Sequence, residues 1–316
     1  MGPEGDGWET AQVGLGMPVG ELVAGLLCSV PEPVVRTGAY VLDPPFFGEG
    51  DVGRVAVCGV VNELAASGAE PRRLTLGIVL EAGLPMPLVR RLTDSVRHAA
   101  DEAAVEIAAV DTRVVRAGEA DRVFVTATAL GVRHPGPPMD PRNIRPSDRL
   151  LVTGPLGSHA AHLLSLRHEL GYEHLVPSDC APLSGLLAQV LPHVRHARAV
   201  TEGGLARVLR SCAAGRGLTL RVDEVALPVQ YEARIALGAL GIDPLEAACA
   251  GCLCLFVPEE RAAMVLSALH AHPYGRQAAV VGEVTADRTG EVQLRGADGE
   301  ARPLGPPDAH APVRLH

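Results

Sequence analysis

The chain has 316 residues, of which 47% are hydrophobic and 21% charged, a balance typical of a globular protein. Its net charge of -9 argues against a nucleic-acid surface, which needs a dense patch of positive charge. Lysine is absent and all 28 residues of the Lys and Arg class are arginine, so a P-loop lysine or a Schiff base is excluded.

The sequence predicts a cytoplasmic protein with reduced thiols. Its longest apolar runs, such as Val55 to Val61, are too short to span a bilayer, and residues 1–30 lack the basic start and cleavage site of a signal peptide. The seven cysteines are an odd number scattered through predicted helices and strands. We therefore expect no disulfide.

The first half of the chain alternates extended and helical patterns. After a glycine-rich start, a helix is predicted from Met17 to Leu27, and a strand from Val34 to Leu42 ends at Asp43-Pro44-Pro45. Asp51 begins the next helix with a charge that suits the helix dipole. The elements predicted from there are a helix at 51–67, a strand at 73–81, an amphipathic helix at 86–99, and strands at 105–115 and 122–132.

The segment 134–146 contains five prolines and predicts a linker between two domains, at 1–133 and 147–316. Beyond it, a strand at 149–153 and a turn at Gly154–Gly157 lead into a helix. Further helices are predicted at 182–195, 204–214, 231–240 and 259–271, with strands at 218–222, 252–257 and 278–284. After Gly296 the chain is polar and rich in proline and glycine. The order of elements predicts a two-domain fold of the α/β or α+β class.

Two motifs have the residue types of binding sites. Gly14-Leu-Gly-Met17 is a short glycine pair, for which a flexible lead-in explains more than a phosphate loop does. Cys249, Cys252 and Cys254 bring three thiols within six residues, as zinc sites do, but a fourth ligand is not evident. Because Cys252 and Cys254 share one face of an apolar strand, where cysteine behaves as a small hydrophobic residue, we expect no zinc.

Four acidic residues follow or interrupt apolar stretches: Asp43, Asp51, Glu63 and Asp111. Loops from several elements could bring such carboxylates around a magnesium ion. Helix capping and turn formation explain the same residues without a ligand, and composition alone favours that interpretation.

Collinear motifs extend from about residue 15 to residue 285. The most specific are Tyr40-Val-Leu-Asp-Pro-Pro-Phe-Phe47, the helix motif that begins Asp51-Val-Gly-Arg-Val-Ala-Val and ends Ala66-Ser-Gly-Ala69, and Gly77-Ile-Val-Leu-Glu-Ala-Gly-Leu-Pro-Met86. Shorter motifs lie at 111–115, 154–159, 178–180, 226–229, 269–273 and 281–284. Together they resemble the hydrogenase maturation protein HypE family of the PurM-like, or aminoimidazole ribonucleotide synthetase, superfamily.

The resemblance implies a PurM-like two-domain fold whose N-terminal domain forms a barrel-like interface in a dimer, with ATP and magnesium beside it and the second domain closing over them. It implies a reaction in which ATP activates the oxygen of a carbamoylated C-terminal cysteine, leaving a thiocyanate. This is phosphoryl transfer, which depends on magnesium and positioned charge. The implied cofactor-binding residues are Asp43, Asp51, Asn62, Glu63, Asp111, Thr112, Thr201, Gly203 and Gly204, with Glu63 and Asp111 as magnesium ligands.

The chain departs from the family pattern at these functional positions. The family's Pro-Arg-x-Cys tail is represented by Val313-Arg-Leu-His316, so the thiol that accepts the carbamoyl group is replaced by an imidazole. Gly38 replaces a carboxylate, and Glu202 places a negative charge where the pattern has arginine. The remaining changes are an Asn-Glu pair at 62–63 for Asn-Asp, Val110 for glycine, Ala199 for aspartate, Ala250-Gly-Cys252 for Glu-Gly-Lys, and Gln12–Gly16 for a glycine-rich start.

Two classes of function remain open on these residues. Asn62, Glu63 and Asp111 favour an ATP-dependent enzyme that dehydrates or activates an amide other than its own tail. The combined loss of charged site residues favours a noncatalytic paralogue. Such a protein would be a homodimer, pair with a HypE-like subunit, or bind another maturation protein.

Overall fold

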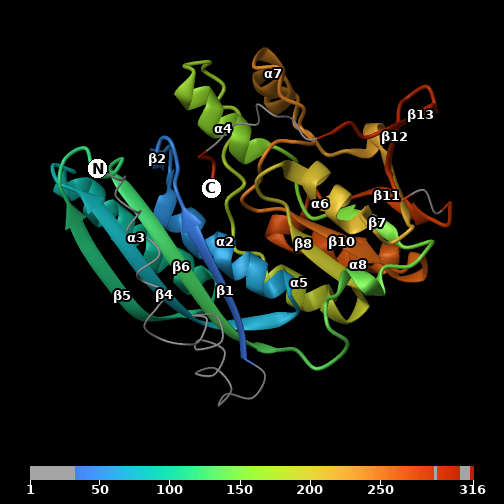
Figure 1. Ribbon diagram of the computed structural model, residues 1–316, viewed down its shortest axis with the longest axis horizontal. Coiled ribbons are helices and arrows are strands. Elements are labelled where there is room, and N and C mark those ends of the chain that lie inside the picture. The colour runs from blue at the N-terminus through green and yellow to red at the C-terminus, as the bar shows by residue number, and fades with distance from the viewer. Residues whose placement is uncertain (1–32, 288–289, 307–313) are drawn as a thin grey trace, which may run out of the picture.

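The computed structural model describes residues 33–287, 290–306 and 314–316 (Figure 1). The predicted helix at 17–27 and the Gly14–Met17 motif lie outside these residues. In the described part of the chain, no helix has both the length and the apolar character needed to cross a membrane.

The first half forms a four-stranded sheet in the order β1-β6-β4-β5. Its strands are β1 (Pro33–Tyr40), β4 (Ala69–Glu81), β5 (Glu106–Val115) and β6 (Val123–Arg133). β6 is antiparallel to β1 and β4, whereas β4 and β5 are parallel because α3 (Met86–Glu102) crosses between them. A short hairpin, β2 (Phe46–Phe47) and β3 (Gly50–Asp51), precedes the first described helix.

That helix, α2 (Val52–Ala66), lies between the two halves of the molecule (Figure 1). Asp51 caps it, because one carboxylate oxygen accepts hydrogen bonds from the amides of Gly53 at 2.9 Å and Arg54 at 3.1 Å. All its residues except Arg54 and Glu63 are buried. The helix contacts β1, β4 and β6 on one side and α5 and β8 on the other, so apolar residues are needed all round it.

The second half forms a seven-stranded sheet in the order β13-β12-β9-β11-β7-β10-β8. Its strands are β7 (Arg149–Val152), β8 (His196–Ala199), β9 (Thr219–Asp223), β10 (Leu253–Val257), β11 (Ala279–Thr285), β12 (Val292–Arg295) and β13 (Ala301–Pro303). Its helices are α4 (Ser158–Arg167), α5 (Ser184–Val190), α6 (Gly204–Ala213), α7 (Tyr231–Ala239) and α8 (Glu259–Ala271). Short 3-10 turns occur at 141–143, 191–193, 224–226 and 273–275.

The structure confirms the mixed α and β fold class and differs from several predicted elements. β2, β3, β8, β12 and β13 were not predicted, because each has only two to four residues and shows little periodicity. The helix predicted at 182–195 is α5 followed by a 3-10 turn, since Pro192 cannot continue the helical hydrogen bonds. Cys252 precedes β10 rather than lying on it. The predicted linker at 134–146 falls between β6 and β7.

Candidate functional site

A cavity of about 390 Å³ lies between the two halves of the molecule. Its walls come from β1, α2, β8, α6 and the segment that joins β8 to α6. Polar and charged residues make up most of its lining, which consists of Thr37, Gly38, Ala39, Tyr40, Gly59, Glu63, Arg198, Ala199, Thr201, Glu202, Arg207, Val208, Ser211 and His316. We call it the interdomain cavity.

Residues 314–316, which we call the tail, reach this cavity through His316. Leu315 makes an antiparallel bridge with Leu42, and the amides of Val41 and Asp43 donate hydrogen bonds to the carbonyls of His316 at 2.9 Å and Arg314 at 3.0 Å. The side chain of Leu315 is buried. The tail therefore extends the edge of the N-terminal half as a short β-like segment.

The second half holds the other side of the tail. Nε2 of His159 lies 2.8 Å from the Leu315 carbonyl, which can only accept, so Nε2 carries the proton and Nδ1 accepts from the Ser178 hydroxyl at 2.7 Å. Arg167 donates to the Arg314 carbonyl at 3.2 Å. Burial lowers the pKa of His159 to about 3, so this imidazole is neutral at physiological pH.

His316 itself points into the site. Its Nε2 donates to the Cys249 carbonyl at 2.6 Å, and its ring lies 5.5 Å from that of His159, centroid to centroid. Burial lowers the pKa of His316. The last side chain of the tail is thus a neutral imidazole that lies beside Cys249 and lines the cavity.

The segment that receives His316 is shaped by a buried carboxylate. Asp179 accepts hydrogen bonds from the amides of Ala250 at 3.1 Å and Gly251 at 3.2 Å, and burial raises its pKa to about 6. A Cβ on Gly251 would lie 1.8 Å from the Asp179 carbonyl oxygen, so only glycine fits here. The carbonyl of Cys249 is thereby fixed beside the tail.

Tyr40 explains the packing around Gly38. A Cβ on either Gly38 or Gly59 would lie 2.7 Å from the Tyr40 hydroxyl oxygen, so the phenol occupies the space next to both glycines. Burial raises the pKa of Tyr40. A larger residue at 38 fits only if the end of this side chain moves.

The predicted site residues are distributed over several places. Glu63 and Thr201 line the interdomain cavity, and Gly203 and Gly204 lie directly beyond it at the start of α6. Asn62 is buried, donating to the Ala181 carbonyl at 2.9 Å and accepting from the Leu183 amide at 2.6 Å, so its side chain joins the two halves. These two bonds account for its polar atoms without a ligand.

The two predicted magnesium ligands do not meet within one chain. Asp111 lies on β5, where it forms an exposed ion pair with Arg113 at 2.7 Å, and Thr112 follows it. Across the sheet, Ala39 on β1 pairs with Thr126, Thr126 with Gly77, and Gly77 with Asp111. Asp111 therefore lies three strand spacings from β1, a distance of about 14 Å. Glu63 and Glu202 are the carboxylates lining the interdomain cavity, whose other charged residues are Arg198 and Arg207. A single chain therefore does not supply the expected magnesium set.

Asp43 and Asp51 lie elsewhere as well. Asp43 binds the tail through its amide, and its carboxylate lies 3.4 Å from Arg167. Asp51 caps α2. Sequence reasoning missed Arg198, Arg207 and Ser211 as cavity residues, although Arg198 directly precedes the altered Ala199–Gly204 motif and could have been included with it.

The described cysteines are free thiols in the core. Sγ of Cys249 accepts from the Gly157 amide at 3.2 Å, and the Cys252 thiol contacts the Gly154 carbonyl at 3.6 Å. Burial raises the pKa of Cys254, which favours the thiol form. In the described residues, no group of three or more His, Cys, Asp or Glu side chains is arranged to hold a metal ion.

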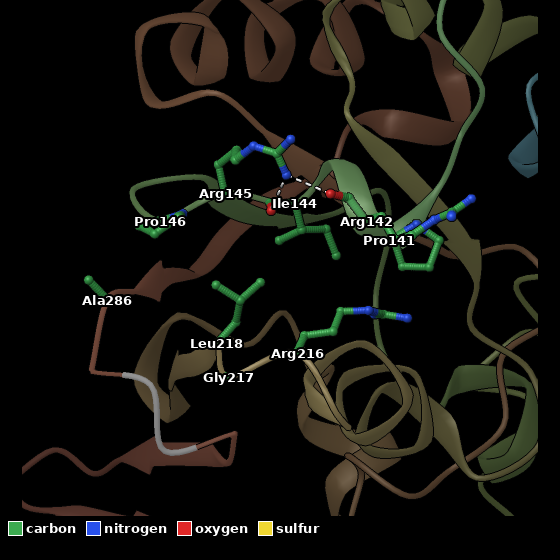
Figure 2. Close-up of a pocket in the computed structure, with 9 residues that line it drawn as sticks. All are labelled: Pro141, Arg142, Ile144, Arg145, Pro146, Arg216, Gly217, Leu218 and Ala286. Atoms are coloured by element: carbon green, nitrogen blue, oxygen red, sulfur yellow. Dashed lines mark hydrogen bonds between the residues drawn. The ribbon is translucent and has the colours of Figure 1, made fainter.

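A second cavity, of about 520 Å³, lies between the 141–146 segment and the loop at 216–218 (Figure 2). Three arginines line it, and each donates to a neighbouring protein group: Arg142 to Asp140, Arg145 to the carbonyls of Arg142 and Ile144, and Arg216 to the Cys212 carbonyl. It includes none of the predicted site residues. The interdomain cavity is the stronger candidate for the site.

Two sequence families match the chain: the N-terminal domain of AIR synthase related proteins over residues 29–133, and the C-terminal domain over 145–295. Carbamoyl dehydratase HypE of Rhodobacter capsulatus is 42% identical over 84% of this chain and 79% of its own, and that of Escherichia coli is 38% identical over 88% and 83%. The chain belongs to the HypE family.

Solved HypE structures confirm the PurM-like two-domain fold. Escherichia coli HypE superposes with a TM-score of 0.86 at 37% identity, covering 93% of this chain and 91% of that one. A HypE structure in complex with ATP superposes with a TM-score of 0.86 at 35% identity, covering 91% of this chain and 88% of that one. A chain of a HypE–HypF complex superposes with a TM-score of 0.83 at 33% identity, covering 87% of this chain and 90% of that one. ATP binding and complex formation are thus properties of HypE relatives.

Several of the positions at which the sequence departs from the HypE pattern lie near the tail. Gly38, Ala199 and Glu202 line the interdomain cavity with His316, while Ala250 and Cys252 flank Gly251 beneath it. These five positions therefore lie near His316 in the fold, whereas Val110, another departure from the pattern, lies on the exposed strand β5.

Proposed function

We propose that this HypE-family protein takes part in hydrogenase maturation without acting on its own tail. The observation that carries the proposal is the position of His316, which is half-buried at the end of the tail and donates to the Cys249 carbonyl. A carbamoyl acceptor in this chemistry is a thiolate, and a neutral imidazole with one nitrogen already bound is a poor replacement.

The region beneath the tail supports the same proposal. The resemblance places Glu-Gly-Lys at positions 250–252, where this chain has Ala250, Gly251 and Cys252. The acid and the base that could move a proton in that pattern are replaced by a methyl group and a buried thiol. The smaller side chains also leave room for an imidazole, which is larger than a cysteine side chain.

We favour a noncatalytic HypE paralogue as the specific role. Its partner would be a second copy, a HypE-like subunit or another maturation protein. β5 is an edge strand exposed along nearly its whole length, and α2 and α3 cover one face of the four-stranded sheet while no described helix covers the other (Figure 1). An unpaired edge and an open sheet face favour association.

An alternative is an ATP-dependent dehydratase that acts on a separate amide. The interdomain cavity supports it, because Arg198 and Arg207 offer positive charge alongside Glu63 and His316. The two roles differ in whether the protein turns over ATP when an external amide is supplied.

The test is to incubate the protein with a carbamoyl-transferring maturation partner and ATP and to measure the intact mass of the tail. We expect no carbamoyl or cyano adduct on the wild type. A His316→Cys variant, with His316→Ala as its control, asks whether a thiol alone restores acceptance. A tail adduct on the wild-type protein would refute the proposal. ATP hydrolysis that depends on an added amide, without an adduct, would select the alternative.

A further inference from the structure

The second cavity, between the 141–146 segment and the loop at 216–218, has the composition of a small-molecule site (Figure 2). Its volume of about 520 Å³ lies within the usual range for such sites, which combine apolar walls with a few polar groups. We call it the arginine cavity. It shares no lining residue with the interdomain cavity, so a ligand bound here is independent of the proposed function.

The walls of the arginine cavity are apolar. Ile144 and Leu218 face each other across it, with Pro141 and Pro146 on the same side as Ile144 (Figure 2). The Ile144 side chain is buried in the core of the second half, and Leu218 packs against the same core. Both side chains are therefore held in place and offer apolar surface to a ligand.

The charge of the cavity fixes the sign of its ligand. Its charged lining residues are Arg142, Arg145 and Arg216. Arg142 binds Asp140 through Nε and Nη2 and lowers the pKa of that carboxyl group to about 2. Among the described residues, neither Arg145 nor Arg216 forms an ion pair, and Nη1 of each donates to main-chain carbonyls instead. The balance of charge here is thus positive, although the chain carries a net charge of -9.

Arg216 has the hydrogen-bonding geometry for a carboxylate. Its Nη1 donates at 2.8 Å to the carbonyl of Cys212, in the last turn of α6, which holds the guanidinium group in place. The Cys212 thiol is also close to this group, but a thiol is a weak acceptor. The edge formed by Nε and Nη2 donates to no oxygen in the described part of the chain. Two parallel N–H donors along one edge match the two oxygens of a carboxylate.

The position of Arg216 connects this charge to the apolar walls. The side chain is half-buried, lines the cavity and extends beneath Pro141, next to the space between Ile144 and Leu218 (Figure 2). One ligand can therefore combine an ionic contact to Arg216 with an apolar contact to the walls.

We propose that the arginine cavity binds a small organic anion in which one carboxylate is joined to an apolar ring. The carboxylate accepts two charge-assisted hydrogen bonds from the Nε and Nη2 edge of Arg216, the stronger kind in proteins. The ring lies against Ile144 and Leu218, where it loses contact with water. Arg142 and Arg145 add positive potential without touching the ligand.

The test uses 2-naphthoate, with 2-naphthamide as its uncharged analogue and acetate as an anion without a ring. The chain has five isoleucines, so the δ1 methyl signal of Ile144 is resolved in the NMR spectrum of methyl-labelled protein and assigned with an Ile144→Val variant. We expect naphthoate to shift this signal saturably. Its Kd should be at least about tenfold lower than that of naphthamide, which lacks the charge, or of acetate, which lacks the apolar contact.

Arg216→Gln removes the charge and should raise the Kd for naphthoate about tenfold or more. Arg234→Gln is the matched control, because it removes the same charge from an exposed position on α7 outside the cavity, and it should change the Kd less than about twofold. Circular dichroism establishes that each variant is folded, and the comparison of the three compounds on the wild type does not depend on any variant.

The proposal is overturned if naphthoate leaves the Ile144 methyl signal unshifted, or if naphthamide or acetate binds as tightly as naphthoate. It is equally overturned if folded Arg216→Gln binds naphthoate as the wild type does.

Discussion

At the scale of single residues, the structure around the tail has glycine at two positions where a side chain would collide with its neighbours. Gly251 must lack a side chain for Asp179 to hold its amide, and that contact presents the Cys249 carbonyl to His316. Gly38 is enclosed by the Tyr40 phenol in the same way. Substitutions here change the shape of the site together with its charge.

His159 makes the stability of the protein depend on pH. Its pKa of about 3 in the folded state is below the ordinary value of about 6.5 in the unfolded chain, so the unfolded state binds more protons between these pH values. The contribution of His159 to stability is therefore fully present above about pH 6.5 and falls as the pH is lowered toward 3. We expect His159→Gln to weaken this dependence in urea titrations at pH 7 and pH 5. Burial also lowers the pKa of His196, to about 4, so this residue contributes in the same direction. Part of the pH dependence should therefore remain in the variant. An unchanged difference between the two pH values would contradict the assignment.

Restoring two charges should strengthen nucleotide binding. We expect the wild type to bind ATP weakly and the double variant Gly38→Asp with Glu202→Arg to bind it at least about tenfold more tightly, since each charged contact contributes on the order of 1 to 3 kcal/mol. The carboxylate introduced at position 38 requires the Tyr40 phenol to move aside. Calorimetry with and without magnesium measures the effect. Glu224→Arg, on a distant 3-10 turn, is the control for added positive charge. Equal affinities would place the nucleotide site elsewhere.

At the scale of elements, the tail acts as a short strand that joins both halves. Leu315 is 2% exposed and bridges Leu42. Leu315→Ala should lower the free energy of unfolding by about 2 to 4 kcal/mol, because it leaves a cavity and loosens the tail. Val225→Ala, where the side chain is 71% exposed, is the matched apolar control and should cost less than about 0.5 kcal/mol. Denaturant titration compares them; equal losses would mean that the tail adds no stability.

Elements with many residues and a clear period could be predicted from the sequence, and short ones could not. α2 and α3 begin and end close to their predicted bounds because Asp51 caps one and apolar spacing marks the other. β8 and the tail gain their extended form from pairing partners distant in the chain, which a local pattern cannot reveal. The same limit applies to the site. Glu63 and Thr201 could be named from motifs, whereas Arg207 and the position of His316 depend on how the halves pack.

At the scale of the whole molecule, the open face of the four-stranded sheet favours a symmetric dimer. Small residues cross it in register at Ala39, Thr126 and Gly77, which allows close approach of a second sheet. We expect a dimer at micromolar concentration by light scattering, and a monomer for Thr126→Arg. Glu300→Arg, in the turn before β13, should remain dimeric. A monomeric wild type would remove this inference.

The burial of α2 between the two halves determines how the molecule unfolds. Because it is buried against both sheets, neither half can separate from it without exposing apolar surface of the other. The two halves should therefore melt as one cooperative unit, with a single calorimetric peak. In hydrogen–deuterium exchange, the amides in the middle of α2 should exchange last, at the rate set by global unfolding. Two resolved peaks, or early exchange in this helix, would show that the halves open independently.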